Sequence, residues 1–463
     1  LVHFGFFPTV PSQPRMAVSI ELLAFYCALF EQSCDAINTL TSALHTHYVW
    51  RGFRVVNKTV QDPFRCGLGF AVQWYDVLQV QVEYKLETAI QACRDRIKSF
   101  KIPSASPHHP MPHTPDQQSF TPNPQRLVTP SHPAPPFPLP ASDAGSNHSL
   151  QLTSSLTPGS CAPILVQRCP ACFGGTTFGQ SLSIDGGDIH VATDGNFHHH
   201  HRRSAGDSPS FYEPAYFLPK GQIDAVGAHI DKQRKKPLKA HKGPILDEAI
   251  DSCESSYEAA DGKKQKTSMD SFDDTGLMVL ICCHDIPLFF ANIDSPGEQQ
   301  KYSVALITHL FSLLPPRATV AVLYDIRCVL ARTLSLYDIL PGPVVQRLHF
   351  ATTAMHAYGH KWACQLVFNP RLAVGMGLSN GEGTERLWSR LIKLIGIEHS
   401  SSVRSTAVGS EMLRDLGDWI KRRLQRGVRE QGKSAQDQIE NCGVHVEELV
   451  RQWASQRESQ LSV

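Results

Sequence analysis

The chain has 463 residues, and its 44 Lys and Arg residues nearly balance its 43 Asp and Glu residues, which leaves a formal net charge of +1. That balance argues against a protein that coats nucleic acid through bulk charge, although it stays compatible with a local basic groove. A hydrophobic content of 41% and a charged content of 19% predict a folded, multi-part chain rather than wholesale disorder. The length suggests roughly two to three domains.

Three further features exclude other classes. The longest apolar run, residues 277–283, has the length of a strand and not the ~20 residues of a membrane span. The chain begins with Leu and lacks the pattern of a secretory signal, so we expect the natural protein to be longer. Without such a signal, thirteen irregularly spaced cysteines suggest reduced thiols or metal ligands rather than a disulfide framework.

The N-terminal third divides into a helical part and a proline-rich part. Apolar residues recur at helical spacing within residues 16–56 and 66–99, which favours helices there. Between Pro103 and Pro158 lie 14 of the 32 prolines, mixed with Ser, Thr and His. Such a segment cannot build strand ladders or a core, so we predict a disordered linker over residues 101–158.

From residue 161 onwards the pattern is typical of an α/β fold. Apolar runs predict a strand that ends at Asp194, a hairpin around residues 284–285, and a buried strand that ends at Asp325. Helices are predicted over residues 245–260 and 301–314. An acid therefore follows the first strand, and another follows the strand after the crossover helix.

This order of elements is that of a ribonuclease-H-like sheet, in which those two acids fall on adjacent central strands. Two acids at one sheet edge can jointly hold a divalent cation, as two-metal phosphoryl transfer requires. A third acid normally comes from a later helix. The helix that opens at Gly381 offers Glu382 and Glu385.

Several short motifs occur along the chain in a fixed order. They are Phe7-Pro8-Thr9, Pro14-Arg15-Met16-Ala17, Ser33-Cys34-Asp35, Gln73-Trp74-Tyr75-Asp76, Arg168-Cys169-Pro170-Ala171-Cys172-Phe173-Gly174-Gly175, Asp194-Gly195-Asn196-Phe197, Gly276-Leu277-Met278, His284-Asp285, Gly297-Glu298-Gln299-Gln300-Lys301-Tyr302, Leu323-Tyr324-Asp325-Ile326, His356-Ala357-Tyr358-Gly359-His360 and Gly381-Glu382-Gly383. With these motifs the sequence resembles the Kyakuja-Dileera-Zisupton (KDZ) transposases, a DDE-type family, and more narrowly their fungal, cysteine-cluster-associated subgroup. The resemblance covers nearly the whole chain outside the proline-rich segment.

The chain departs from the family pattern at two places. Cys282-Cys283-His284-Asp285 stands where the family tends to have Cys-Arg-His-Asp, and Asn380 replaces an acid before Gly381. Neither change touches the expected catalytic carboxylates.

The resemblance implies a DNA transposase that cleaves and joins phosphodiesters with Mg²⁺ or Mn²⁺. The expected catalytic residues are Asp194, Asp325, Glu385 and Glu382, and the first three are the expected Mg²⁺ ligands. Glu385 is favoured over Glu382 because residues 384–389 resemble the glutamate helix of hAT-type transposases. The implied partners are the terminal repeats of a transposon and target DNA, the chain is expected to form a homo-oligomer, and the implied location is the nucleus.

Cysteine and histidine spacings suggest zinc at two places. Cys169 and Cys172 form half of a tetrahedral site, which Cys282 and His284, or Cys161, would complete; two reduced thiols explain the pair equally well. His356, His360 and Cys364 lie four residues apart, so on a helix they would share one face. That face would bind zinc, order the insertion before the glutamate helix, or pack into a core.

Basic clusters are candidate DNA contacts, namely Arg202, Arg203, Lys232, Arg234, Lys235, Lys236 and Arg386. The run from Lys232 also suits a nuclear import signal or a solvated loop. The four histidines 198–201 are expected to continue into a strand edge rather than to bind metal.

We therefore predict an α/β protein with a ribonuclease-H-like DDE core, interrupted by a helical insertion and preceded by an α-helical region. The expected boundaries are 1–100 for the helical region, 101–158 for the linker, 159–430 for the core with an insertion at about 327–380, and 431–463 for a helical tail. The main alternative is a catalytically inactive, transposon-derived DNA- or zinc-binding protein. A two-metal nuclease without strand transfer ranks third.

Overall fold

The computed structural model describes residues 1–10, 12–14, 16–33, 37–53, 63–99, 157–205, 216–240, 243–256, 271–295, 297, 299–392, 395 and 416–461. Apart from residues 157 and 158, the predicted linker lies outside these residues. The chain forms two compact units, one of Leu1–Tyr75 with Ser154–Val463 and one of Asp76–Thr153. Among the described residues, no helix is both long and apolar enough to cross a bilayer.

The N-terminal part is helical, as predicted, but begins with a small hairpin. The described elements are the short 3₁₀ helix η1 (Val2–Phe4), the antiparallel strands β1 (Phe6–Pro8) and β2 (Ala17–Ser19), and the helices α1 (Ile20–Ser33), α2 (Ile37–Trp50) and α3 (Pro63–Ser99). Phe7, Leu23, Tyr26, Leu68 and Tyr75 are buried together in a small core of their own. The stretch predicted as helical over residues 16–56 is therefore a strand followed by two helices.

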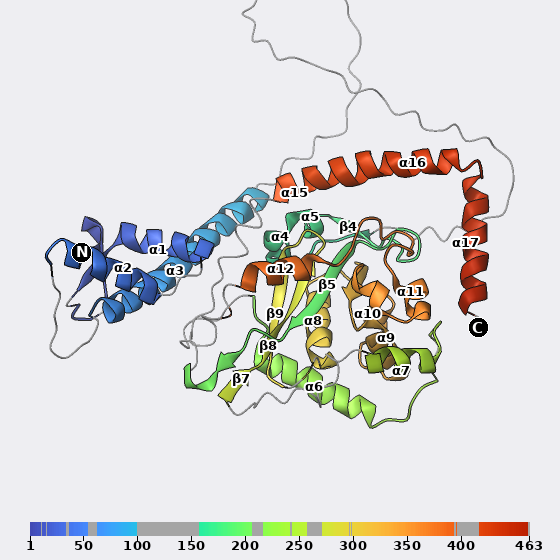
Figure 1. The fold of residues 1–463 in the computed structure, drawn as a ribbon, viewed down its shortest axis with the longest axis horizontal. Helices are drawn as coiled ribbons and strands as arrows, with labels where there is room; N and C mark the ends of the chain where they lie inside the picture. The colour runs from blue at the N-terminus through green and yellow to red at the C-terminus, as the bar shows by residue number, and fades with distance from the viewer. Residues whose placement is uncertain are drawn as a thin grey trace, which may run out of the picture. The chain divides into compact units, whose positions relative to one another are not determined.

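A five-stranded mixed sheet forms the centre of the larger domain (Figure 1). Its strand order is β11 (Leu348–Ala351), β10 (Val320–Tyr324), β5 (Ile189–Asn196), β8 (Gly276–Cys282) and β9 (Pro287–Ile293). β5, β8 and β9 are antiparallel neighbours, whereas β10 runs parallel to both β5 and β11. The predicted hairpin and the predicted strand before Asp325 are confirmed.

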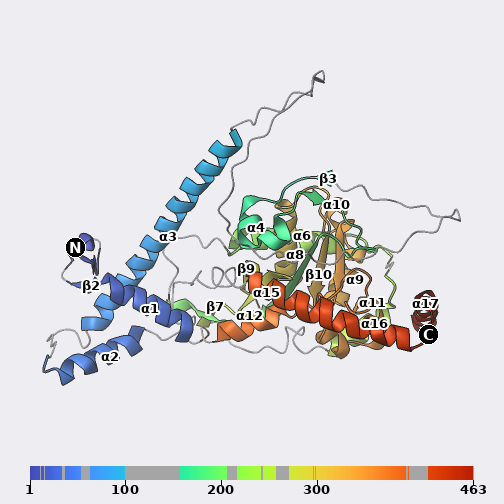
Figure 2. The same ribbon diagram turned by 90° about the horizontal axis from the view of Figure 1, so that it is seen from above.

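Helices cover both faces of this sheet (Figure 2). On one face, His309 of α8 (Gln300–Ser312) stacks edge-on against Phe289, with 4.5 Å between ring centroids. Phe289 is paired with Leu280, and the next residue of β8, Ile281, points to the opposite face. There α12 (Gly383–Leu391) approaches so closely that a Cβ at Gly383 would lie 3.4 Å from Ile281.

The remaining elements surround this core. They are β3 (Thr157–Pro158), α4 (Pro163–Arg168), α5 (Pro170–Phe173), β4 (Thr177–Phe178), β6 (His201–Arg202), η2 (Arg203–Ala205), α6 (Lys220–Arg234), α7 (Asp247–Ser256), β7 (Phe272–Asp274), α9 (Arg327–Leu336), α10 (Gly342–Val345), η5 (His356–Gly359), α11 (Trp362–Phe368), α15 (Leu416–Arg423), the π-helix η7 (Leu424–Gln431), α16 (Gly432–Asn441) and α17 (Val446–Leu461). The segment expected as a helical insertion, about 327–380, contains helices but also supplies β11 to the sheet.

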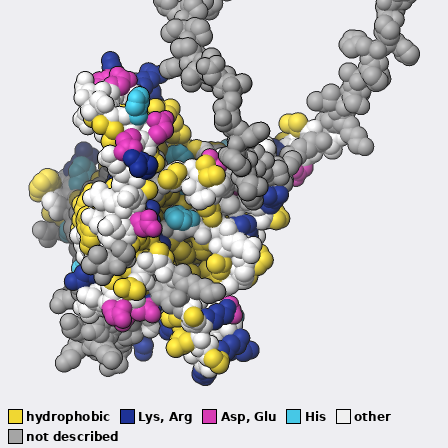
Figure 3. Space-filling model, turned by 90° about the vertical axis from the view of Figure 1, so that its right-hand side faces the viewer, with side chains coloured by type: hydrophobic (Ala, Val, Ile, Leu, Met, Phe, Trp, Pro, Cys, Tyr) yellow, Lys and Arg dark blue, Asp and Glu magenta, His cyan; other side chains and the backbone are white. Residues whose placement is uncertain are grey.

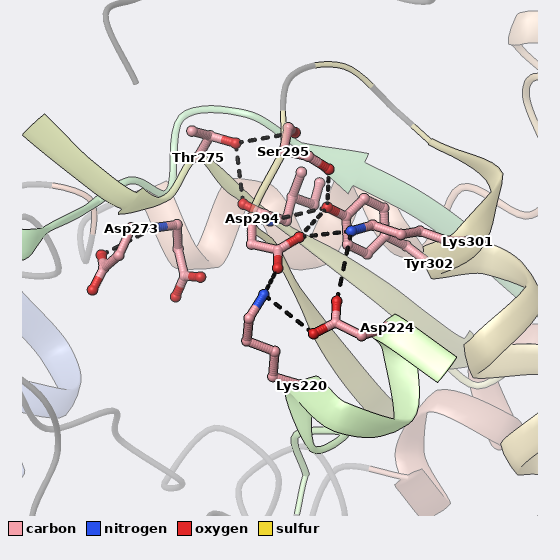
Figure 4. A network of polar contacts seen from close by, with 10 residues as sticks. Lys220, Asp224, Asp273, Thr275, Asp294, Ser295, Lys301 and Tyr302 are labelled. Atoms are coloured by element: carbon pink, nitrogen blue, oxygen red, sulfur yellow. Dashed lines mark hydrogen bonds and ion pairs between the residues drawn. The ribbon is translucent and has the colours of Figure 1, made fainter. Parts of the chain in front are cut away.

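A polar network at the end of β9 explains one of the motifs (Figure 4). Asp294 accepts hydrogen bonds from Lys301 Nζ at 2.9 Å and from Tyr302 Oη at 2.7 Å, both in the first turn of α8. Lys220 of α6 forms an ion pair with the same carboxylate. Asp294 thus joins α6 and α8 to the sheet, and the Lys301-Tyr302 pair of the motif supplies the contacts from α8, which is a structural role.

Candidate active site and metal centres

The two predicted aspartates lie at equivalent positions on neighbouring parallel strands. Thr193 of β5 is paired with Tyr324 of β10, and the next residue of the chain after each is an aspartate, Asp194 or Asp325. Asp325 directly follows β10 as predicted, whereas the predicted end of the first strand at Asp194 is wrong, since β5 continues to Asn196. Because side chains alternate along a strand, both aspartates belong to the face that α12 covers. Asp194 is paired on its other side with Val279, which shares this face with Ile281.

The segment Gly381-Glu382-Gly383 brings α12 to these aspartates. Gly381 has a φ of +75°, and a Cβ there would lie 2.8 Å from Thr353 and 2.9 Å from Leu323. A Cβ at Gly383 would lie 2.7 Å from Asp285 Oδ1. Both positions therefore need glycine, and their close approach places Glu382 at the N-cap of α12 and Glu385 in its first turn.

Asp325 lies in a polar pocket made by the segment after β11. Thr353 Oγ1 donates a hydrogen bond of 2.5 Å to Asp325 Oδ1, and His356 Nδ1 is 3.1 Å from Asp325 Oδ2. Burial raises the pKa of Asp325, and the nearby Glu382 and Glu385 raise it further, against the opposing effect of Thr353 and His356. Negative charge is therefore concentrated here, which a cation would relieve.

The two glutamates differ in their surroundings. Glu382 is 7% exposed; its Oε1 accepts a hydrogen bond of 2.8 Å from the Met355 amide, and its Oε2 is buried without a hydrogen-bond partner among the described residues. Glu385 has a half-exposed side chain, with its Oε1 3.9 Å from His356 Nε2. A buried carboxylate oxygen without a donor fits a bound cation or water.

Asp194 is held from the opposite direction. Trp388 Nε1, on the same helix as Glu385, donates a hydrogen bond of 2.7 Å to Asp194 Oδ2. No three carboxylates in the described part of the chain have oxygens within 4.8 Å of one another, whereas two sets of cysteines and histidines do. The acids thus lie on one side of the sheet, but no three of them come as close together as the cysteine and histidine ligand atoms described next.

The first of these sets, which we call cluster A, consists of Cys169, Cys172, Cys282 and His284. Cys169 lies between α4 and α5 and Cys172 lies in α5, whereas Cys282 ends β8 and His284 lies in the β8–β9 turn. His284 Nδ1 is 3.1 Å from Cys172 Sγ and 3.5 Å from Cys169 Sγ. The CxxC pair and its first predicted complement are therefore together, and these four side chains fit a tetrahedral zinc site.

Electrostatics within cluster A show how strongly its groups interact. Burial opposes the charged form of His284, but its contacts with Cys169, Cys282 and Cys283 outweigh burial and raise its pKa to about 12. Contact with Cys172 is the main cause of a lowered pKa for Cys169. Cys161, the other predicted complement, is not in this cluster, and burial together with Asp188 raises its pKa to about 11.

Cluster A is linked to α12 through one residue. Asp285, which follows His284, accepts two hydrogen bonds from Arg386, at 2.6 Å from Nε and 2.7 Å from Nη2. This pair connects α12 to the β8–β9 turn. The Arg386 side chain is also 44% exposed, and its role as a DNA contact stays a prediction.

The second set, cluster B, corrects a prediction. His356, His360 and Cys364 were expected on one helical face, but His356–Gly359 is a 3₁₀ helix, His360 is extended, and α11 begins at Trp362. His356 instead contacts Asp325, while His360 and Cys364 join Cys253 and Cys328. Single cysteines on α7 and α9 carry no spacing signal, so the sequence did not reveal these two.

The basic candidates lie at two places other than Arg386. Lys232 and Arg234 are in the last turn of α6, and Lys235 and Lys236 follow it directly. Arg202 lies on β6, Arg203 donates to the Phe272 carbonyl, and Arg234 donates to Gln300. On the face shown in Figure 3, Lys and Arg side chains of the described residues lie in small separate groups. Of the histidine run, His201 pairs with Asp274 as part of β6, in line with the expected strand edge.

Comparison with known families adds a single result. Residues 188–407 match the family model described as Kyakuja-Dileera-Zisupton transposase. This region is similar to KDZ transposases. The matched region contains both aspartates and both glutamates. It supports a transposase-derived protein, and the transposase family implies DNA as a partner. No curated protein and no solved structure matches the chain significantly.

Proposed function

We propose that this chain is a DDE-type DNA transposase of the fungal, cysteine-cluster-associated KDZ subgroup, with its site at Asp194, Asp325 and the α12 glutamates. The observation that carries the proposal is the equivalent position of the two aspartates on adjacent parallel strands, with both glutamates at the same face. The strand order, with an antiparallel meander followed by two parallel strands, supports a ribonuclease-H-like core.

Each residue of the proposed site would have a separate role. Asp194, Asp325 and Glu382 would hold Mg²⁺ or Mn²⁺, which would activate the attacking oxygen and stabilise the leaving oxygen on a DNA phosphodiester. Thr353 and His356 fix the orientation of Asp325. We favour Glu382 over Glu385 as the third ligand because Glu382 is buried and has an oxygen without a donor among the described residues.

A strand-transfer assay tests this proposal. The full chain is incubated with Mg²⁺ and DNA carrying the chromosomal sequences that flank its coding region, and nicked and joined products are measured. Asp325→Asn should lower both products by about 100-fold or more, since removing one group that stabilises developing charge costs that much. Asp338→Asn, which changes an exposed aspartate near the end of α9, is the matched control.

Two further variants assign the third acid. Glu382→Gln should abolish products, whereas Glu385→Gln should retain most of them; the reverse result would return the role to Glu385. Equal activity of wild type and Asp325→Asn would refute the catalytic proposal. A nuclear location and a homo-oligomer go with this proposal, and both are measurable by fractionation and light scattering.

A second candidate is a transposon-derived protein that binds DNA or zinc without catalysis. It is favoured by the contrast between the tight cysteine clusters and the looser carboxylates. Under this alternative, the chain would bind the flanking DNA in a shift assay with equal affinity in the presence of Mg²⁺ or EDTA, and would form no products.

A further inference from the structure

Cluster B brings together three parts of the chain that are distant in the sequence. Cys253 lies on α7, Cys328 on α9, His360 directly after η5, and Cys364 on α11. Their ligand atoms all lie within 4.8 Å of one another, and all four residues are buried. Around them lies a small apolar core that includes Ile250 and Phe368.

The spacing of these atoms fits a tetrahedral ion. Cys253 Sγ is 3.1 Å from His360 Nδ1, and Cys328 Sγ is 3.8 Å from the same nitrogen. Zinc bonds of about 2.3 Å to sulfur and about 2.0 Å to nitrogen place tetrahedral ligands about 3.5–3.8 Å apart. Both observed distances join sulfur to nitrogen, and they lie on either side of the value of about 3.5 Å that such a pair has around zinc.

A buried arginine beside the cluster supplies the matching charge. Arg327, next to Cys328, is 7% exposed, and its Nε and Nη1 have no hydrogen-bond partner among the described residues. Burial lowers the pKa of Arg327, whereas the nearby Cys328 and Cys364 oppose that shift, and the guanidinium lies over the ring of Phe368, a residue of the same apolar core. Zn²⁺ with three thiolates and a neutral imidazole carries a net charge of −1, which one guanidinium neutralises.

We propose that Cys253, Cys328, His360 and Cys364 bind a structural Zn²⁺ ion, with Arg327 as its charge-balancing neighbour. Four protein ligands leave no open position, so this ion holds the fold together and does not act on a substrate. The proposal is independent of catalysis, because it rests on cluster B and Arg327 alone.

The position of cluster B gives this ion a second consequence. Cys328 follows Asp325 by three residues, and His360 follows His356, the residue that contacts Asp325, by four. The ion would therefore fix both segments that surround Asp325. Cluster A is linked through Asp285 and Arg386 to α12, the helix that carries Glu385.

Metal content tests the proposal directly. Purified full-length protein should contain about two zinc ions per chain by elemental analysis, one for each cluster. Cys253→Ser and Cys169→Ser should each retain about one ion, and exposed Cys442→Ser should retain both. A Cys253→Ser protein with the same zinc content as wild type would overturn the assignment.

A second measurement covers the case in which Cys253→Ser does not fold. X-ray absorption of zinc in the Cys169→Ser variant, where cluster B remains intact, should show three sulfur neighbours at about 2.3 Å and one nitrogen at about 2.0 Å. Cluster B is refuted if that variant holds no zinc or if a different ligand set surrounds it.

The role of Arg327 has its own test. In competition with a chelator such as EDTA, Arg327→Met should bind zinc about 10- to 100-fold more weakly than the wild type does. Residues that contact metal ligands usually have an effect of this size. Arg317→Met, which changes an exposed arginine between α8 and β10, should leave retention unchanged. If zinc content follows this pattern but strand transfer is absent, the zinc inference stands and the catalytic proposal fails.

Discussion

The indole of Trp388 donates a 2.7 Å hydrogen bond to Asp194, one of the two aspartates that end up side by side on the central strands. This contact connects α12 to β5, and it links an optical probe to a carboxylate that we propose as a metal ligand. Because indole emission responds to nearby charge and hydrogen bonding, Trp388 can report on ions that bind at Asp194.

A divalent cation should therefore change the emission of Trp388. Titration with Mn²⁺ or Mg²⁺ should give a saturable change in tryptophan fluorescence, because an ion at Asp194 Oδ2 competes with the indole for that oxygen. Trp388→Phe should remove the change in fluorescence, and Asp325→Asn should weaken binding of the ion by about 10-fold or more. An identical titration curve for Asp325→Asn would separate Asp325 from the metal site.

Replacing Arg386 should destabilise the fold, although the arginine side chain is 44% exposed. Its bidentate pair with Asp285, a carboxylate with only 12% side-chain exposure, loses one partner in Arg386→Met. A charged hydrogen-bonding group left unsatisfied costs about 2 kcal/mol of unfolding free energy. Urea denaturation measures this loss.

The control for Arg386→Met is Arg451→Met, whose pair with Glu448 is exposed at the arginine. Exposed pairs contribute about 0–1 kcal/mol, so that variant should unfold nearly as the wild type does. Equal loss in both variants would show that Asp285 does not depend on Arg386.

Gly381 should tolerate no side chain. Gly381→Ala combines an unfavourable φ of +75° with a Cβ only 2.8 Å from Thr353, and should lower the unfolding free energy by about 2–3 kcal/mol. It should also displace Glu382. In Gly221→Ala, on α6, the new methyl group meets no atom within 4 Å, so stability should be unchanged or slightly higher.

The central strands could be predicted because the residues of each strand alone indicate it. All seven residues of β8 are buried, so its sequence is a continuous apolar run, and the acids near the end of β5 and directly after β10 stand out against such runs. β11 has only four residues, two of them half-buried, and such a short strand is not distinguishable from its helical surroundings.

Cluster B could be predicted only in part. His360 and Cys364 are near each other in the sequence, but Cys253 and Cys328 come together with them through long-range packing of α7, α9 and α11. The CxxC pair of cluster A, by contrast, has a spacing that chemistry dictates. Contacts such as that of Trp388 with Asp194 depend on the placement of a helix across a sheet, which no local pattern encodes.

His349 makes stability depend on pH. Burial, together with Arg327 and His190, lowers the pKa of His349 on β11 to about 4. In the unfolded chain the imidazole protonates near pH 6.5, whereas in the folded chain it stays neutral until about pH 4. The unfolded state therefore binds more protons in this window, and unfolding free energy falls as the pH drops from about 6.5 to about 4.

Denaturation at a series of pH values measures this effect. Between pH 7 and pH 5, wild type should lose about 2 kcal/mol more than His349→Gln does, because the variant has no imidazole to protonate on unfolding. His445→Gln, which removes an exposed histidine, should keep the wild-type slope. Protonation of the cysteine clusters affects all three proteins alike, so the difference between wild type and His349→Gln isolates His349. Parallel curves for these two proteins would mean that the imidazole titrates equally in the folded and unfolded chain.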